Sequence, residues 1–244
     1  LLKKKKLKIG VNTNGLALDR AKAEAIAECC EYCRISLDCG DAKLYRVTHG
    51  MDKRAFAAVI ENIRYLAVFK QKTGSSLSLG TGFLTGGETV SQMDSFVKLS
   101  KECGVDFAQF RPFQEDMTDI SAEYARLRQK YEDKSFQVLA SMQKYEAFQG
   151  GMAKPYDHCR GLFFSTVITA NARVYACLHH RQDPRYLIGD MREGKSFADI
   201  WSSYRKWQVF EEIDVQGCPA FCRNDAINRT LDGLSKKVFH QEFL

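Results

Sequence analysis

The spacing of apolar residues along positions 1–113 predicts strands that alternate with helices. Apolar segments at 7–13, 32–38, 76–84 and 105–113 have the length of buried strands. Between them lie segments with apolar residues three or four positions apart, the longest running from Asp52 to Thr73. Strands that alternate with helices pair in parallel, so we expect an α/β fold. Ligands of such folds bind at the carboxyl edge of the sheet.

From His158 onward the pattern changes. Residues 161–177 are typical of a β-hairpin, and a short strand at 186–190 and one helix over 196–213 follow. The segment between these two regions is mostly helical in pattern, with a short strand near 135–141. We therefore predict an α/β domain over 1–113, a helical connection over 114–157 and a small second module over 158–244.

Composition narrows the class of protein. The chain is 45% hydrophobic and 27% charged, which suits a globular protein. No run approaches eighteen apolar residues and no secretory leader is present, so we expect a cytoplasmic protein with no membrane partner. The net charge of +6 is mild and both signs are mixed, so a nucleic-acid partner is not favoured.

The chain has nine cysteines, which favour metal or redox chemistry over disulfides in a reducing cytosol. Five of them have a simple explanation as small core residues: Cys29, Cys30, Cys33, Cys39 and Cys103.

The other four cysteines are spaced for a shared site. Cys159 and Cys177 stand at the two ends of the predicted hairpin, and Cys218 and Cys222 form a Cys-x3-Cys knuckle. Four thiolates brought together in this way suit a tetrahedral zinc ion or an iron–sulfur cluster, and the spacing does not distinguish the two. Redox-active thiols and unconnected core cysteines remain alternatives.

Several segments of the chain resemble those of a known enzyme family. "FFSTVITANARVYACLHH", "YLIGDM", "SFADIWSSYR" and "CPAFCRNDAINR" resemble the Twitch or SPASM auxiliary-cluster domain of radical S-adenosylmethionine (radical SAM) enzymes. "VNTNG", "RISLDCGD", "SLGTGFLTGGET" and "GVDFAQFRPF" are similar to the third to sixth strands of the radical SAM partial barrel. The resemblance implies the C-terminal part of a partial (β/α)6 TIM-like barrel, followed by a small α+β module.

The chain departs from the family pattern in two places. "ANAR" replaces the usual glycine of the hairpin turn, and the chain has no Cys-x3-Cys-x2-Cys loop for the cluster that cleaves S-adenosylmethionine. Four predicted strands also cannot close a barrel. We therefore expect an N-terminal part that carries this loop, and we expect the 244-residue chain alone to be inactive.

The resemblance also implies roles for individual residues. The four spaced cysteines would ligate one auxiliary [4Fe–4S] cluster, since four fit the shorter Twitch version and a full SPASM domain needs about seven. Arg111 would bind an anionic or hydroxyl-rich substrate. Asn14, Ser36 and Asp38 would contact S-adenosylmethionine. The alternatives are strand packing for Ser36, a cap for Asp38 and an ion pair for Arg111.

Several neighbouring residues are weaker candidates. His179 and His180 follow Cys177 and could donate hydrogen bonds to cluster sulfurs. Lys144 and Tyr145 are candidates for the substrate pocket. Along 105–113 we expect the apolar residues Val105, Phe107 and Phe113 to face the helices.

The implied function is a radical SAM enzyme that takes a hydrogen atom from a small polar metabolite such as a sugar, cyclitol or nucleotide-linked compound. The auxiliary cluster would accept an electron or anchor the substrate. S-adenosylmethionine and a second [4Fe–4S] cluster would be its further cofactors, and flavodoxin or ferredoxin its electron donor. A peptide substrate is the alternative. Two alternatives belong to different functional classes. One is a non-enzymatic α/β binding module stabilised by zinc, and the other is the electron-transfer half of a larger assembly.

Overall fold

The computed structural model describes residues 5–113, 116, 118–150 and 153–235. The chain separates into two compact units, Leu1–Gln149 and Gly150–Leu244. The predicted segment boundaries after residues 113 and 157 stay predictions.

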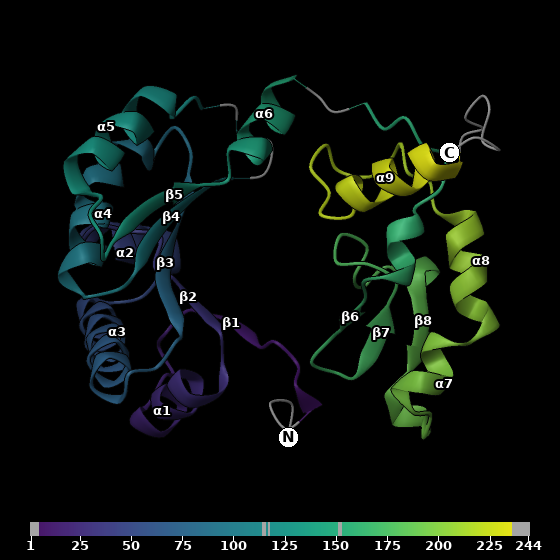
Figure 1. Cartoon of the computed structure of the whole chain (residues 1–244), viewed down its shortest axis with the longest axis horizontal. Coiled ribbons are helices and arrows are strands. Elements are labelled where there is room, and N and C mark those ends of the chain that lie inside the picture. Colours follow the sequence, from purple (N-terminus) through teal and green to yellow (C-terminus); the bar gives the residue numbers. More distant parts are fainter. Residues whose placement is uncertain (1–4, 114–115, 117, 151–152, 236–244) are drawn as a thin grey trace, which may run out of the picture. The chain divides into compact units, whose positions relative to one another are not determined.

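The first unit is built on a parallel sheet of five strands in the order β1-β2-β3-β4-β5 (Figure 1). The fifth strand pairs with the fourth from Phe107↔Gln137 to Phe110↔Ala140, so the segment after residue 113 extends the sheet. The expected α/β fold is confirmed. The strands are β1 (Gly10–Thr13), β2 (Tyr32–Ser36), β3 (Ser78–Thr85), β4 (Phe107–Pro112) and β5 (Gln137–Ala140).

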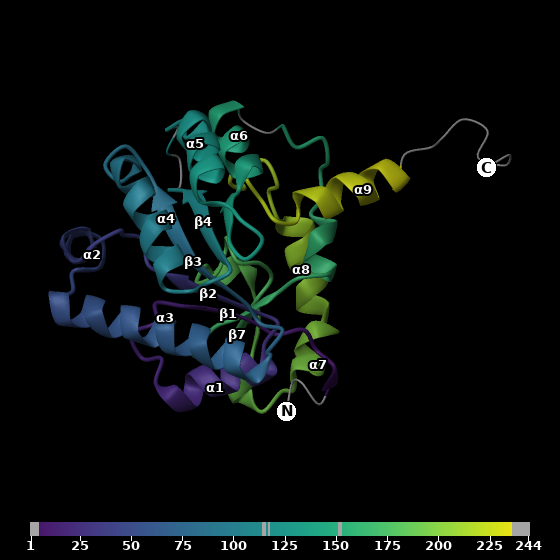
Figure 2. The ribbon, with the colours of Figure 1, turned by 60° about the vertical axis from the view of Figure 1, so that its left-hand side comes forward.

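Helices cover one face of this sheet (Figures 1 and 2). The longest, α3, begins after Asp52, whose carboxylate accepts hydrogen bonds from the amides of Arg54 and Ala55, and ends at Gly74 in the left-handed conformation. The helices are α1 (Arg20–Cys29), α2 (Ala42–His49), α3 (Lys53–Thr73), the short 3-10 helix η2 (Val90–Gln92), α4 (Met93–Glu102), α5 (Ser121–Tyr131) and α6 (Met142–Gly150).

Alternate residues of each strand face the helices. In β2 and just after it, Cys33, Ile35 and Leu37 are fully buried in the core beneath the helices. Because side chains alternate along a strand, Tyr32 and Arg34 lie on the opposite, open face of the sheet. The helix-covered face therefore holds the core, and the other face is available for polar chemistry.

The structure corrects the expected orientation of β4. Ala108 and Phe110 lie in the core under the helices, where the Phe110 ring is 5.7 Å from that of Phe96 on α4. Phe107 lies on the open face and stacks on Tyr32 of β2 at 5.7 Å. The prediction is wrong for Phe107, because an aromatic neighbour buries it on the open face. It is confirmed for Val105, which lies in the core, whereas Phe113 is exposed.

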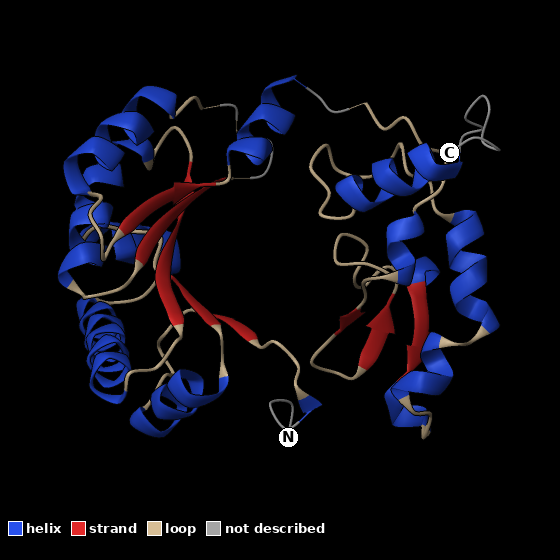
Figure 3. Ribbon diagram, in the orientation of Figure 1, coloured by secondary structure: helices blue, strands red, loops and turns tan. Residues whose placement is uncertain are grey.

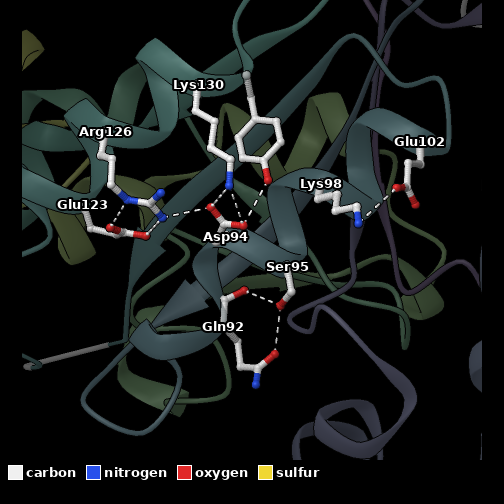
Figure 4. A network of polar contacts seen from close by, with 9 residues as sticks. Gln92, Asp94, Ser95, Lys98, Glu102, Glu123, Arg126 and Lys130 are labelled. Atoms are coloured by element: carbon white, nitrogen blue, oxygen red, sulfur yellow. Dashed lines mark hydrogen bonds and ion pairs between the residues drawn. The ribbon is translucent and has the colours of Figure 1, made fainter.

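An ionic network joins α4 to α5 (Figure 4). The Asp94 carboxylate accepts hydrogen bonds from Lys130 at 2.9 Å, Arg126 at 2.8 Å and the Tyr131 hydroxyl at 2.9 Å. The hydrogen bond from Lys130, with those from Arg126 and Tyr131, lowers the pKa of Asp94 to about 2. The network holds α5 against α4, directly before the strand that completes the sheet.

The second unit contains an antiparallel sheet in the order β6-β7-β8, with helices beside it (Figure 3). Pairing of Val167 with Tyr175 confirms the expected hairpin. The elements are η3 (Arg160–Phe163), β6 (Val167–Ile168), β7 (Arg173–Tyr175), η4 (Pro184–Tyr186), β8 (Leu187–Asp190), η5 (Met191–Glu193), α7 (Phe197–Trp201), α8 (Tyr204–Glu212) and α9 (Asp225–Ser235).

The single helix expected over 196–213 is wrong, because α7 ends before α8 begins. The Ser202 hydroxyl donates to the carbonyl of Ala198, and the Ser203 hydroxyl donates to that of Ile200. Serine side chains that bond to nearby backbone in this way compete with continuation of a helix. Among the described residues, no helix is long and apolar enough to cross a membrane.

Gly80 on β3 should be intolerant of a side chain. A Cβ there would overlap the ring of Phe107, which is 4% exposed and stacked on Tyr32. We expect Gly80→Ala to lower the free energy of unfolding by about 1–3 kcal/mol. Gly87→Ala is the control, since a Cβ at Gly87 has no heavy atom within 4 Å. Urea denaturation measures both variants, and equal stabilities would contradict this packing.

Candidate functional site

The four spaced cysteines come from three separate parts of the second unit. Cys159 directly precedes η3, and Cys177 follows β7 at the end of the hairpin. Cys218 and Cys222 lie in the connection between α8 and α9. The hairpin and the knuckle therefore bring together thiols that lie up to 63 residues apart in the chain (222 − 159).

The four thiols form one electrostatic group. Cys218 interacts with each of the other three, Cys222 with Cys159 and Cys177, and Cys177 with Cys159. Burial raises the pKa of Cys177, Cys218 and Cys222, that of Cys218 to about 11, and repulsion between the thiolates adds to the rise. Thiolates gathered in this way are stabilised by a positively charged metal group.

Hydrogen-bond donors point at the sulfurs. Backbone amides of His179 and His180 donate to Cys177, and that of Asn224 donates to Cys222. The His180 ring lies 3.4 Å from the sulfur of Cys218, measured from Nε2, and stacks on Tyr186. Donors of this kind stabilise thiolate ligands and tune the potential of a cluster. The tuning role of His180 stays a prediction.

The sequence analysis did not predict that Asn228 contacts one of the four cysteines. This residue of α9 is 1% exposed, and its Nδ2 donates to the sulfur of Cys159 at 3.4 Å. Its Oδ1 accepts from the amide of Gly161 at 2.7 Å, so one side chain joins α9 to the loop that carries the first cysteine. Gly161 also makes room for Asn224, because a Cβ at position 161 would lie 2.5 Å from the Cβ of Asn224. The repeat of asparagine four residues apart was the available signal.

Four cysteine thiols can hold either one zinc ion or a [4Fe–4S] cluster. Zinc would hold four thiolates ~3.8 Å apart, because each Zn–S bond is about 2.3 Å long. Among the described residues, no group of three or more His, Cys, Asp and Glu side chains is arranged to hold one ion. A [4Fe–4S] cluster binds each thiolate to a different iron and so holds the sulfurs farther apart. Four cysteine thiols are the donor set that a [4Fe–4S] cluster requires.

The remaining five thiols belong to the first unit. Cys33 and Cys39 are fully buried in the core of the first unit, Cys103 is 3% exposed, and Cys29 is exposed at the end of α1. Burial raises the pKa of the Cys33 thiol to about 12. His158 lies beside Glu211, with 3.9 Å between Nε2 and the carboxylate.

A second polar region lies at the carboxyl edge of the five-stranded sheet. Asn14 follows β1, and its Oδ1 accepts from the amide of Leu16 at 3.1 Å, which closes a local turn. Ser36 ends β2 on the open face, where it pairs in register with Gly82 of β3. Both residues lie at the predicted edge, and their contact with S-adenosylmethionine stays a prediction.

Asp38 joins two strands. Its Oδ1 accepts from the amide of Leu84 at 2.7 Å, and its own amide donates to the carbonyl of Gly82 at 3.1 Å. The residue adopts a φ of 51°, a left-handed conformation that aspartate tolerates better than most residues. Burial raises the pKa of Asp38, opposed by the hydrogen bond from Leu84. The alternative of a cap is not observed, because the carboxylate of Asp38 binds the backbone of β3 and Asp41 caps α2. The cofactor role of Asp38 stays a prediction.

Arg111 lies near Asp38 and near a second arginine that sequence reasoning missed, Arg34 of β2. Burial and the neighbouring Arg34 guanidinium lower the pKa of Arg111, while Asp38 opposes this shift. No ion pair of Arg111 is found among the described residues, and its Nε has no hydrogen-bond partner there, so the alternative of an ion pair is not observed. Tyr145 approaches the same edge, with its hydroxyl 2.6 Å from Thr85 Oγ1, and burial raises its pKa to about 12.

Comparisons with known proteins found a family model that matches the second unit and solved structures that are similar to most of the chain. The model of the SPASM family, an iron–sulfur cluster-binding domain, matches residues 159–224. SuiB of Streptococcus suis bound to S-adenosylmethionine has a TM-score of 0.60 at 14% identity, over 87% of this chain and 51% of SuiB. SuiB bound to the precursor peptide SuiA has a TM-score of 0.58 at 15% identity, again over 87% and 51%. Curated proteins gave no match.

The four-thiol site lies within the match to the iron–sulfur cluster-binding SPASM domain, and the fold of the chain is similar to that of SuiB. Residues 159–224 are a SPASM domain, and the α/β unit has the fold of the corresponding part of the SuiB partial barrel. The resemblance found in the sequence is thus confirmed. The chain spans about half the length of SuiB.

The ligand assignment predicts the iron content of the chain. Anaerobic reconstitution should load about four irons per chain, as one four-cysteine cluster requires. Cys222→Ser should lower the bound iron, because serine is a poorer ligand for iron. Cys103→Ser should not, because Cys103 is buried in the core of the other unit. Iron and zinc analysis decides the matter: equal losses from both variants, or zinc without iron in protein purified without added metal, would contradict the assignment.

The contact of Asn228 with Cys159 predicts an effect on the cluster potential. Asn228→Asp keeps an acceptor for the Gly161 amide but replaces the donor to Cys159 with a negative charge. We expect the reduction potential to fall by about 60 mV, a tenfold change in a one-electron equilibrium. A redox titration followed by electron paramagnetic resonance measures it. Asn171→Asp in the exposed hairpin turn is the control, and an equal shift in both variants would refute a local role.

Proposed function

We propose that this chain is the SPASM-containing part of a radical SAM enzyme that modifies a peptide. The observation that carries the proposal is the combination of a four-thiol site within the SPASM match and a polar, open-faced sheet in the fold of SuiB. SuiB binds S-adenosylmethionine and the precursor peptide SuiA, as its structures are described. This favours a peptide over the small polar metabolite that the sequence suggested.

The residues of the sheet edge would bind and orient the reactants. Asn14, Ser36 and Asp38 offer amide, hydroxyl and carboxylate groups for S-adenosylmethionine at the carboxyl ends of β1 and β2. Arg111 offers a planar, permanently charged donor group to the substrate from β4. The hydroxyl of Tyr145, bound to Thr85, limits the movement of α6 at the same edge.

S-adenosylmethionine, together with a cluster that reduces it, would supply the 5′-deoxyadenosyl radical that takes a hydrogen atom from the peptide. The electron for that cleavage would come from a donor such as flavodoxin or ferredoxin. Cys159, Cys177, Cys218 and Cys222 would hold the auxiliary cluster where the second electron of a two-electron oxidation is received, or where the peptide is anchored.

Deuterium transfer tests the substrate class. The full product of the gene is incubated anaerobically with a reduced donor, S-adenosylmethionine and deuterated peptides encoded beside the gene. We expect deuterium in the 5′-deoxyadenosine and a peptide that has lost two hydrogen atoms, both measured by mass spectrometry. A deuterated sugar, cyclitol or nucleotide sugar that labels 5′-deoxyadenosine in place of the peptide would overturn the proposal.

Matched variants connect the thiol site to this reaction. Cys222→Ser should still form 5′-deoxyadenosine but should yield at least tenfold less modified peptide for each molecule formed, because the auxiliary cluster is impaired. Cys103→Ser should leave this ratio unchanged. Unchanged coupling in the Cys222 variant would remove the auxiliary cluster from the proposed reaction.

A further inference from the structure

Two arginines occupy the open face of the first unit on either side of β3. Arg34 comes from β2 and Arg111 from β4, and the strand between them has glycine at position 82, opposite Gln109 of β4. The Arg34 side chain crosses β3 above this glycine, since a Cβ at Gly82 would lie 3.2 Å from its Cδ and Nε. Its Nη1 then donates to Gln109 Oε1 at 2.5 Å. The glycine therefore makes room for an arginine that reaches from the second strand to the fourth.

Both arginines have donors without a partner. The Nε atoms of Arg34 and Arg111 are buried and make no hydrogen bond within the described part of the chain. Every other buried side-chain nitrogen or oxygen atom of the described residues has a hydrogen-bond partner. A buried donor left unpaired costs about 1–3 kcal/mol, so two such donors on one sheet face point to a ligand that accepts from them.

The charges on this face do not balance. The two guanidinium groups repel each other, and the acidic side chain of Asp38 interacts with both. The carboxylate of Asp38 is already bound to the amide of Leu84, and burial raises its pKa. Two guanidinium groups against one committed carboxyl group leave an excess of positive charge. A single additional carboxylate would complete the balance.

We propose that Arg34 and Arg111, here called the arginine pair, bind the side-chain carboxylate of an aspartate or glutamate in the peptide substrate. The inference rests on the proposed function and names the residue type that the site selects. Guanidinium groups bind carboxylates through paired, charge-assisted hydrogen bonds. Gln109 positions Arg34, because it occupies one Nη of that side chain and leaves the Nε unpaired.

Side-chain NMR of the 244-residue protein tests the pair directly. The probe is N-acetyl-L-glutamate amide, and its uncharged match is N-acetyl-L-glutamine amide. We expect the glutamate probe, and not the glutamine probe, to shift the Nε–H signals of Arg34 and Arg111. Arg34→Gln and Arg111→Gln should each weaken binding at least tenfold. Arg54→Gln, on the exposed start of α3, should leave it unchanged. The remaining amide signals verify that each variant is folded.

Three other outcomes would contradict the proposal that the arginine pair binds a carboxylate of the substrate. Equal binding of both probes would show that charge is not recognised. Displacement of the glutamate probe by S-adenosylmethionine, with the same Nε–H shifts, would assign the arginines to the cofactor. Tighter binding of inorganic phosphate would favour a phosphorylated ligand.

The deuterium-transfer experiment separates the proposed peptide reaction from the proposed carboxylate binding by the arginine pair. Deuterium transfer from a peptide without acidic residues, at the rate seen with an acidic one, would reject the pair and leave the peptide reaction standing. Binding of the glutamate probe by a protein that takes no deuterium from any peptide would keep the site and reject the reaction.

Discussion

The first unit depends on a sheet that has one face covered by the helices of that unit. Side chains alternate along each strand, so Ile35 is fully buried under the helices while Arg34 and Ser36 on either side of it lie on the opposite face. Parallel pairing then places the polar residues of neighbouring strands in register. The alternation of side chains along the strands therefore places apolar residues in the core and polar residues on the other face, where they can bind a ligand.

In the second unit a small core positions four thiols that repel one another as thiolates. Val174, Ile188, Ile200 and Val209 pack together, and the chain returns three times to the thiol group. Amide donors to Cys177 and Cys222 and the side chain of Asn228 partly offset the cost of thiolate burial. A bound cluster would offset the rest, so we expect metal binding and folding of this unit to be coupled.

Local patterns predicted the elements well where one face of an element is clearly apolar. The helix from Asp52 to Thr73 is an example, because its apolar residues recur every three or four positions. The pattern failed where a neighbour distant in the chain decides the outcome. Phe107 is apolar but lies on the open face against Tyr32, and the helix expected over 196–213 divides at two serines that bond to the preceding turn. For the contact of Asn228 with Cys159 the sequence offered only the spacing of Asn224 and Asn228, which does not name the sulfur that is contacted.

The sequence by itself determined the alternation of strands and helices, and it supplied four cysteines at the hairpin ends and in a Cys-x3-Cys knuckle, because these features depend on spacing along the chain. Only the tertiary structure decided that Arg34 crosses Gly82 to reach Gln109, a residue 75 positions away. The physical reason is strand pairing: the partners of a β-strand are set by the packing of whole βα units, and this information is not present in any local segment.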